Sequence, residues 1–272
     1  NLSWSADEVD LQPRPSNFAD DDQHLTAMKA DLILAAFGFN ESFAGKDGVK
    51  DFAARLSAYL KDLKSKAYNG KTAPMIVLVS PIPNENVKGV AAATQNNTNL
   101  KAYAEVMQKV AKEQGVAFVN LLSPLEKQMA AKDSDLTMNG CHLNEKGYSL
   151  FAKTLFGLLF EKAAPTTSSK LRAAVVEKNK QHFYRFRPLN TFYYTGGRNR
   201  SYGYLDFLPA MRNFDLMVAN RDNRIHRIAG GEDLSPIIND SNVPPLPLSK
   251  ASRGANKWMS PKDERAAFKV DP

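Results

Sequence analysis

The stretch DLILAAFGFNE, residues 31–41, indicates the fold most clearly. Its first seven residues, 31–37, form an apolar run that is too short for a buried helix and leads into a glycine turn. Two further runs share this character, namely MIVLV at 75–79 and VAFVNLL at 116–122. Each run therefore predicts a strand that is buried on both faces, as the strands of parallel sheets are.

Helical patterns lie between and after these runs. Residues 49–64, 99–114 and 145–160 each place leucines and other apolar side chains on one side of a helix. Alternating strands and helices of this length predict an α/β fold, a three-layer α/β/α sandwich built on a parallel sheet with right-handed connections.

The composition changes after residue 162. The segment AAPTTSSK, residues 163–170, is typical of a linker, and helices are expected over 171–186 and 216–229. The aromatic and arginine-rich stretch 182–198 is better suited to covering a core or an interface than to binding bases. From residue 233 the chain is rich in Pro, Ser and Asn, which predicts an extended linker. We therefore expect a domain over 1–162, a helical, aromatic-rich extension over 163–232 and a Pro-rich linker over 233–272.

Composition and charge exclude several classes of function. No run approaches the roughly 18 apolar residues of a membrane span, and no cluster has metal-ligand spacing, so no metal or other cofactor is predicted. One cysteine, Cys141, cannot form an intrachain disulfide. The net charge of +7 arises after residue 168, where 18 Lys and Arg face 10 Asp and Glu. These charges are scattered, which favours a solvated surface over nucleic-acid binding.

Two motifs follow the predicted strands. Gly38-Phe39-Asn40 comes directly after the first run, where a glycine allows close backbone approach and an asparagine amide is able to donate to an oxyanion. Read alone, this is a glycine turn with an Asn cap. His142, in the loop NGCHLN before the helix at 145–160, is well held to act as a general base. Ligands bind at the carboxyl ends of strands in such sheets, so both motifs belong at one edge.

This pair of motifs, with NLSWSAD at residues 1–7 in front of it, resembles the second, third and fifth conserved blocks of the SGNH, or GDSL, hydrolases. The resemblance covers residues 1–162 and implies a flavodoxin-like sheet and serine ester hydrolysis. It also implies that Asn40 is the oxyanion asparagine and His142 the base.

The chain departs from the family pattern at three places. Ala6 stands where the second block has its glycine, and only its backbone N–H is able to donate. Asn139 stands where a carboxylate orients the histidine, and an amide does not stabilise an imidazolium by charge. Asp135 is a nearby substitute with the wrong spacing. The third departure is the nucleophilic serine block, which in the family ends the first strand and has no counterpart in this chain.

Three other residues are candidates for the nucleophile. Ser42 and Ser80 lie near the expected sheet edge but suit caps or turns. Cys141 is next to His142 in sequence and should have difficulty presenting its sulfur to that imidazole, so we expect it to pack. We therefore expect about 40 or more residues before Asn1 that carry the serine and a strand from the middle of the sheet, following the family's typical architecture. Without that strand the sheet should have a central gap.

A closer resemblance, carried by GFNESFAG, LTMNGCHLNEKGY and MVANRDNRIH, is to the N-terminal domain of large secreted proteins of planctomycete-type bacteria. It implies a secreted or periplasmic protein whose later parts are a dehydrogenase-like propeller and a haem-binding module. Two functions stay open. One is an ester hydrolase, for example of acetyl groups on carbohydrate. The other is an inactive SGNH-fold module for binding or assembly within a larger redox protein.

Overall fold

The computed structural model describes residues 2–14, 19–131, 134–166, 168–187 and 204–246, with side chains of the last range described from residue 209. The chain divides into two compact units, Asn1–Ala164 and Pro165–Pro272.

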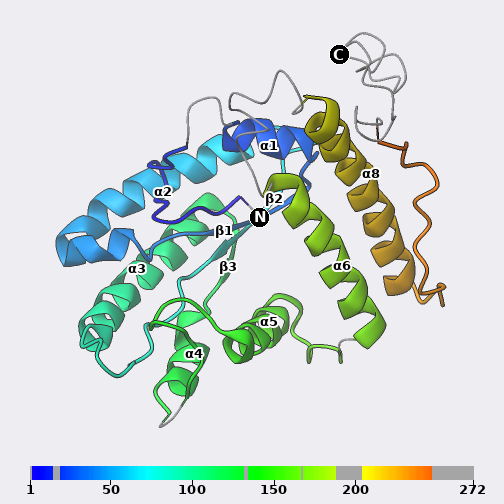
Figure 1. The fold of residues 1–272 in the computed structure, drawn as a ribbon. Coiled ribbons are helices and arrows are strands. Elements are labelled where there is room, and N and C mark those ends of the chain that lie inside the picture. Colours follow the sequence, from blue (N-terminus) through cyan, green and yellow to red (C-terminus); the bar gives the residue numbers. More distant parts are fainter. Residues whose placement is uncertain (1, 15–18, 132–133, 167, 188–203, 247–272) are drawn as a thin grey trace. The chain divides into compact units, whose positions relative to one another are not determined.

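A parallel sheet forms the centre of the first unit (Figure 1). Its strands are β1 (Leu32–Ala36), β2 (Met75–Val79) and β3 (Ala117–Val119), in the order β1-β2-β3. All three predicted strands are present, but the prediction that each is buried on both faces is wrong for β1, which alternates between exposed and buried side chains. β3 is shorter than its apolar run, because the chain turns at Asn120 and enters α4 (Leu122–Met129).

Two helices cover one face of the sheet. They are α2 (Val49–Lys64), which has the predicted bounds, and α3 (Ala93–Gln114), which begins six residues earlier than its apolar pattern. Their apolar sides pack on alternate residues of β1 and β2, including Ile33 and Leu78. The side chains that α2 buries there are Phe52, Leu56, Leu60 and Leu63.

α5 (Glu145–Phe160) covers the opposite face together with α4. Val77, Val79 and Val119 of β2 and β3 form a core on this side. The α5 residues packed against it are Leu150, Phe151, Leu155 and Leu159. Helices on both faces of a parallel sheet give the expected three-layer α/β/α arrangement (Figure 1).

The outer edge of β1 differs from what the sequence predicts. The strands pair continuously, so the expected central gap is absent, and among the described residues β1 pairs only with β2. Leu32 and Leu34, which point away from α2 and α3, are 53% and 48% exposed. In the strand order 2-1-3-4-5, strands 3, 4 and 5 are adjacent to one another and strand 1 lies beside strand 3, so a sheet of strands 3-4-5 has no central gap.

Two short helices complete this unit. α1 (Asp21–Ala27) begins with a capping box, in which Asp20 accepts from the Gln23 N–H and the Gln23 side chain accepts from the Asp20 N–H. The 3-10 helix η1 (Glu41–Gly48) follows β1 and leads into α2. Among the described helices of the chain, none is long and apolar enough to cross a membrane.

The second unit is built on two helices, α6 (Ser169–Phe186) and α8 (Tyr204–Ala229). α8 begins twelve residues before its predicted start and continues through Pro209. Residues 233–246 form no helix or strand, as their composition predicts. They nevertheless bind α8, since Asn213 Nδ2 donates to the Pro244 carbonyl at 2.8 Å. Most of the aromatic stretch, from 188 to 198, lies outside the described residues, as does the linker from residue 247 onward.

Candidate functional site

The turn after β1 holds the predicted oxyanion asparagine. Gly38 has φ +96°, which favours glycine, and a Cβ there would lie 3.0 Å from the Met107 sulfur, so a larger residue would also have to displace the Met107 side chain. Asn40 Nδ2 donates to the Asp7 carbonyl at 2.9 Å. This bond ties the turn to the block that contains Ala6.

Glu41 completes this connection, and sequence reasoning gave it no role. Its carboxylate is buried, and it accepts from the Gly38 N–H at 2.8 Å and the Val9 N–H at 3.0 Å. Burial raises the pKa of Glu41, while the backbone N–H donors, including Val9 and Gly38, oppose the shift. The only signal in the sequence is its position directly after the GFN turn.

Ala6 lies in a turn with its backbone in the left-handed region, at φ +66°. An L-residue is strained there, whereas glycine is not. The neighbouring Asp7 is held by Arg14, whose two terminal nitrogens lie 2.6 and 2.9 Å from the carboxylate oxygens. The backbone shape that a glycine would adopt is therefore kept, although alanine occupies the position.

His142 is bound by Asn139. Asn139 Oδ1 accepts from the His142 backbone N–H at 3.0 Å and lies 3.0 Å from His142 Nδ1. Because this oxygen already acts as an acceptor, Nδ1 forms a hydrogen bond with it only when Nδ1 carries the proton. In a neutral imidazole this leaves Nε2 unprotonated and able to accept a proton.

Cys141 is closer to the imidazole than expected. Its sulfur lies 3.3 Å from His142 Nδ1 and 3.5 Å from Asn139 Oδ1, so the prediction that it has difficulty presenting its sulfur to the ring is wrong. Burial raises the pKa of the Cys141 thiol, which favours the neutral form. The sulfur also meets Nδ1, the nitrogen that Asn139 binds. A neutral thiol in this place is not an activated nucleophile.

Glu85, in the loop after β2, anchors the histidine loop. Its buried carboxylate accepts from the backbone N–H groups of Leu136 (2.9 Å) and Thr137 (2.7 Å), and from the hydroxyls of Ser134 and Thr137. Burial opposes ionisation, but these hydrogen bonds outweigh it and lower the pKa of Glu85.

The backbone of Glu85 fixes the same loop, since its N–H donates to the Gly140 carbonyl at 2.8 Å. Gly140 has φ +95°, and a Cβ there would lie 2.7 Å from Asn84 Nδ2. Sequence reasoning missed Asn84 and Glu85. Their place just beyond the end of β2 was the available signal.

The remaining candidates have other partners. Asp135 pairs with Lys146 at 2.9 Å and does not replace the orienting carboxylate. Ser42 donates to the Phe39 carbonyl at 2.6 Å. Ser80 is buried and its hydroxyl accepts the first N–H groups of the α4 turn. Both serines are therefore turn or cap residues, as expected. Within the described ranges, no group of three or more His, Cys, Asp or Glu residues is placed to hold a metal.

The structure brings the predicted residues together as two pairs. Asn40 is linked to the Ala6–Asp7 turn, and Asn139 is linked to His142. Asn40 follows the carboxyl end of β1, and the His142 loop is bound to the loop that follows the carboxyl end of β2. Both pairs thus belong to the edge of the sheet at which α/β proteins bind ligands.

Comparison with solved structures finds similar chains among esterases. A catalytic mutant of Axe2, an acetylxylan esterase from Geobacillus stearothermophilus, has 14% identity and a TM-score of 0.40 over 54% of this chain and 71% of its own. Axe2 itself has 15% identity and a TM-score of 0.38 over 52% and 65%. A lipase/acylhydrolase from Enterococcus faecalis has 17% identity and a TM-score of 0.37 over 52% and 67%. This chain thus spans about two thirds of the length of each.

No curated protein matches the chain. The model of the GDSL-like lipase/acylhydrolase family, however, matches residues 1–150, which is more than half of the sequence and contains every site residue described above. The chain therefore belongs to the GDSL-like lipase/acylhydrolase family.

Proposed function

We propose that this chain forms the larger part of a serine ester hydrolase whose base is His142. The observation that carries the proposal is the 3.0 Å contact between His142 Nδ1 and Asn139 Oδ1. In the tautomer that donates from Nδ1, Nε2 is unprotonated and therefore suited to taking the proton of a serine hydroxyl. Family membership supports an acyl ester as the substrate.

The oxyanion would be held by Asn40 and Ala6. An asparagine amide has two N–H donors, and the bond to the Asp7 carbonyl occupies one of them. The second is available for the oxygen that becomes negative in the transition state. The Ala6 backbone N–H would donate the other hydrogen bond to this oxygen.

The serine would come from a strand added at the open edge of β1. The apolar, half-exposed Leu32 and Leu34 are suited to burial beneath such a strand and a covering helix. A parallel strand paired with β1 would end at the same edge as Gly38. We propose that a segment preceding Asn1 supplies both the strand and the nucleophile.

Acetylated carbohydrate is the first substrate class to test, and acetylated xylan is the natural starting point because Axe2 acts on it. We further propose that the protein is secreted or periplasmic and belongs to a longer chain with a propeller and a haem module. Mass spectrometry of the native protein from separated cell fractions tests both points. Recovery of an unextended chain from the cytoplasm alone would contradict them.

A binding or assembly module is the second candidate. The neutral side chain of Asn139 favours it, because an amide lacks the charge that stabilises the imidazolium formed during catalysis. The strained alanine at position 6 favours it as well.

Labelling of the natively purified protein with a fluorophosphonate probe, followed by peptide mapping, separates the two candidates. An active hydrolase should be labelled on a serine, and His142→Ala should abolish labelling. His182→Ala, a change of the same kind in α6, should leave it intact. Absence of labelling, with a serine peptide preceding Asn1 present in the map, would refute the hydrolase and favour the binding module.

A further inference from the structure

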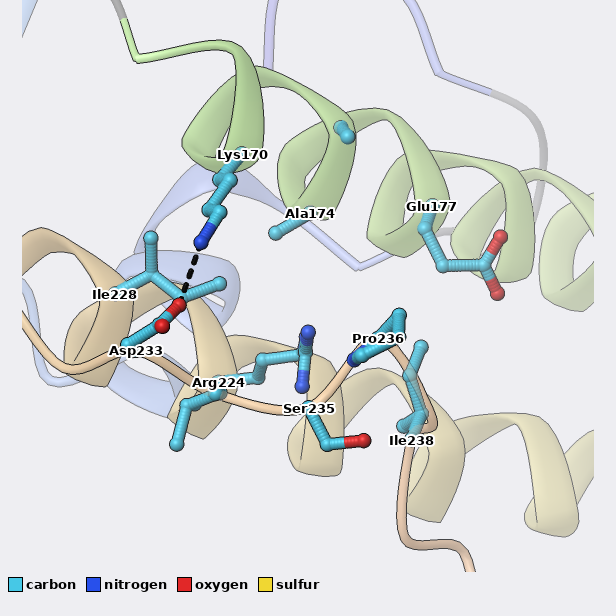
Figure 2. Close-up of a pocket in the computed structure, with 11 residues that line it drawn as sticks. Lys170, Ala174, Glu177, Arg224, Ile228, Asp233, Ser235, Pro236 and Ile238 are labelled. Atoms are coloured by element: carbon cyan, nitrogen blue, oxygen red, sulfur yellow. Dashed lines mark hydrogen bonds and ion pairs between the residues drawn. The ribbon is translucent and has the colours of Figure 1, made fainter.

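A cleft of about 810 Å³ lies within the second unit (Figure 2). Its walls are the first half of α6, the last turns of α8 and the segment that follows α8, residues 233–238. A cleft of this volume is large enough for a small organic ligand. It is formed entirely by the second unit, whereas the proposed hydrolase site lies in the first.

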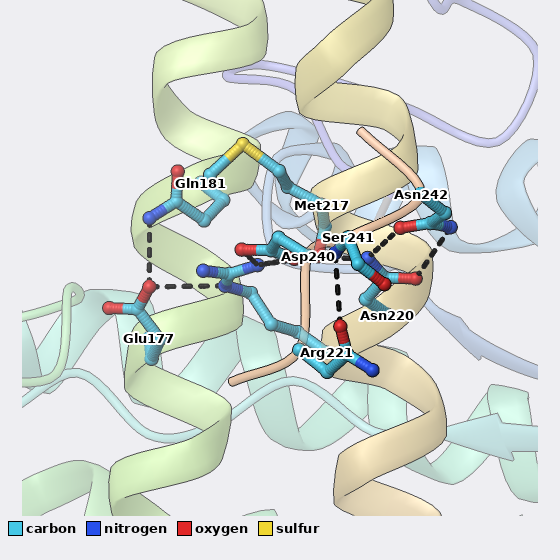
Figure 3. A network of polar contacts seen from close by, with 9 residues as sticks. Glu177, Gln181, Met217, Asn220, Arg221, Asp240, Ser241 and Asn242 are labelled. Carbon is cyan, nitrogen blue, oxygen red and sulfur yellow. Dashed lines mark hydrogen bonds and ion pairs between the residues drawn. The ribbon is translucent and has the colours of Figure 1, made fainter. Parts of the chain in front are cut away.

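The walls are held together by Arg221 (Figure 3). This buried guanidinium lies 3.0 Å from Glu177 of α6 and 3.0 Å from Asp240 of the following segment. Asn220 donates to the same Asp240 oxygen at 2.9 Å. Three separate stretches of chain therefore meet at one cation, which gives the cleft a defined shape.

Arg224, one turn after Arg221, is the cation that these pairs leave available. Its half-buried side chain lines the cleft, and Figure 2 shows its guanidinium directed between α6 and Ser235. Lys170 pairs with Asp233 at 2.5 Å. Among the described residues, Arg224 forms no hydrogen bond or ion pair. Its planar guanidinium can therefore donate two parallel hydrogen bonds to a carboxylate.

The rest of the lining is largely aliphatic. It comprises Ala173, Ala174, Ile228, Leu234, Pro236 and Ile238. These side chains favour a ligand whose body is apolar. Glu177 provides a negative charge in the lining. The hydrogen bond from Gln181 and the pairing with Arg221 lower the pKa of Glu177, while burial opposes this shift. An ionised Glu177 would repel a second anionic group in the cleft.

We propose that this cleft binds a small aliphatic monocarboxylate, with the carboxylate on Arg224 and the aliphatic body against α6, Ile228 and Ile238. The charge of Arg224 selects the anion, and the charge of Glu177 discriminates against dicarboxylates. The proposal is independent of the hydrolase activity.

NMR titration of the full chain with sodium hexanoate tests the site. Hexanoate should shift the amide signals of Ala174, Arg224 and Ile238 in a saturable manner. Hexanamide and adipate should each bind at least about tenfold more weakly than hexanoate. Arg224→Gln should weaken hexanoate binding about tenfold. Arg227→Gln is the matched control, because Arg227 lies one turn further along α8 and pairs with Glu232 at 2.7 Å.

Ala173→Trp offers a second route, since position 173 is exposed and the larger ring should fill the cleft without disturbing the helix pair. It should abolish the hexanoate shifts while the other amide signals stay in place. The proposal is overturned if hexanoate gives no saturable shifts, if hexanamide binds equally well, or if Arg224→Gln binds as the unchanged protein does.

Discussion

Replacing Glu85 by glutamine tests how the histidine loop is held. The carboxylate accepts four hydrogen bonds from Ser134, Leu136 and Thr137, two at each oxygen. A glutamine amide has one oxygen, so its NH₂ group would face one backbone N–H donor and one hydroxyl instead of accepting from both. Hydrogen bonds to a charged group contribute about 1.5–3 kcal/mol each. Allowing for relaxation of the loop, we expect Glu85→Gln to lower the free energy of unfolding by about 3 kcal/mol.

The effect should depend on pH in a defined direction. The pKa of Glu85 in the folded protein is lower than in the unfolded chain. Its stabilisation is therefore complete above the unfolded pKa of about 4.3 and is lost as the pH falls through the folded pKa. The difference between the unchanged protein and Glu85→Gln should be largest near neutral pH and should shrink in acid.

Hydrogen exchange at the Leu136 and Thr137 amides is the most direct assay, because these N–H groups donate to Glu85. A loss of 3 kcal/mol corresponds to exchange about a hundredfold faster. Glu126→Gln is the control, since Glu126 pairs with Lys101 at the surface, where such a pair contributes at most about 1 kcal/mol. Unchanged exchange in Glu85→Gln, or a loss equal to that of the control, would refute the anchoring role.

Four further substitutions have definite expected outcomes. Gly147→Ala would place its Cβ 2.1 Å from the Leu136 carbonyl oxygen, so it should lower the unfolding free energy by about 2 kcal/mol or more, measured by urea unfolding. In the same helix, a Cβ at Gly157 would lie 3.7 Å from the Lys162 carbonyl oxygen, which is an ordinary contact. Gly157→Ala should therefore raise the unfolding free energy by about 0.5–1 kcal/mol. Ala6→Gly should relieve the strain at φ +66° and stabilise the protein by about 0.5 kcal/mol. Asn139→Asp should add a charge beside the imidazole and increase esterase turnover at least about tenfold, measured with a chromogenic acetyl ester on the protein that carries its serine.

Each of these predictions has an outcome that contradicts it. Equal effects at the two glycines would mean that the α5 backbone shifts freely at its first turn. Ala53→Gly within α2 should destabilise by about 0.5–1 kcal/mol, so a similar loss in Ala6→Gly would show that position 6 is not strained. Unchanged turnover in Asn139→Asp would mean that the imidazole is not oriented from this side.

The layered α/β fold can be predicted from local patterns in the sequence. The apolar runs at 31–37 and 75–79 predicted two strands correctly, although only β2 has both faces largely buried and β1 is buried on one face. Local periodicity located the helices at 49–64 and 145–160 without error at either end. Such patterns are local, so they are readable from residues close together in the chain.

Tertiary structure decided how the candidate site is held. Glu85 lies about fifty residues before the loop that it anchors, and Glu41 binds the backbone of Val9 across more than thirty. Neither carboxylate belongs to a sequence pattern, because its role depends on N–H donors that only the folded chain brings near. The same holds for the sulfur of Cys141 beside the imidazole. It holds too for the outer edge of β1 and for Arg224, neither of which has a partner among the described residues. Each feature follows from which groups meet in space and not from their order along the chain.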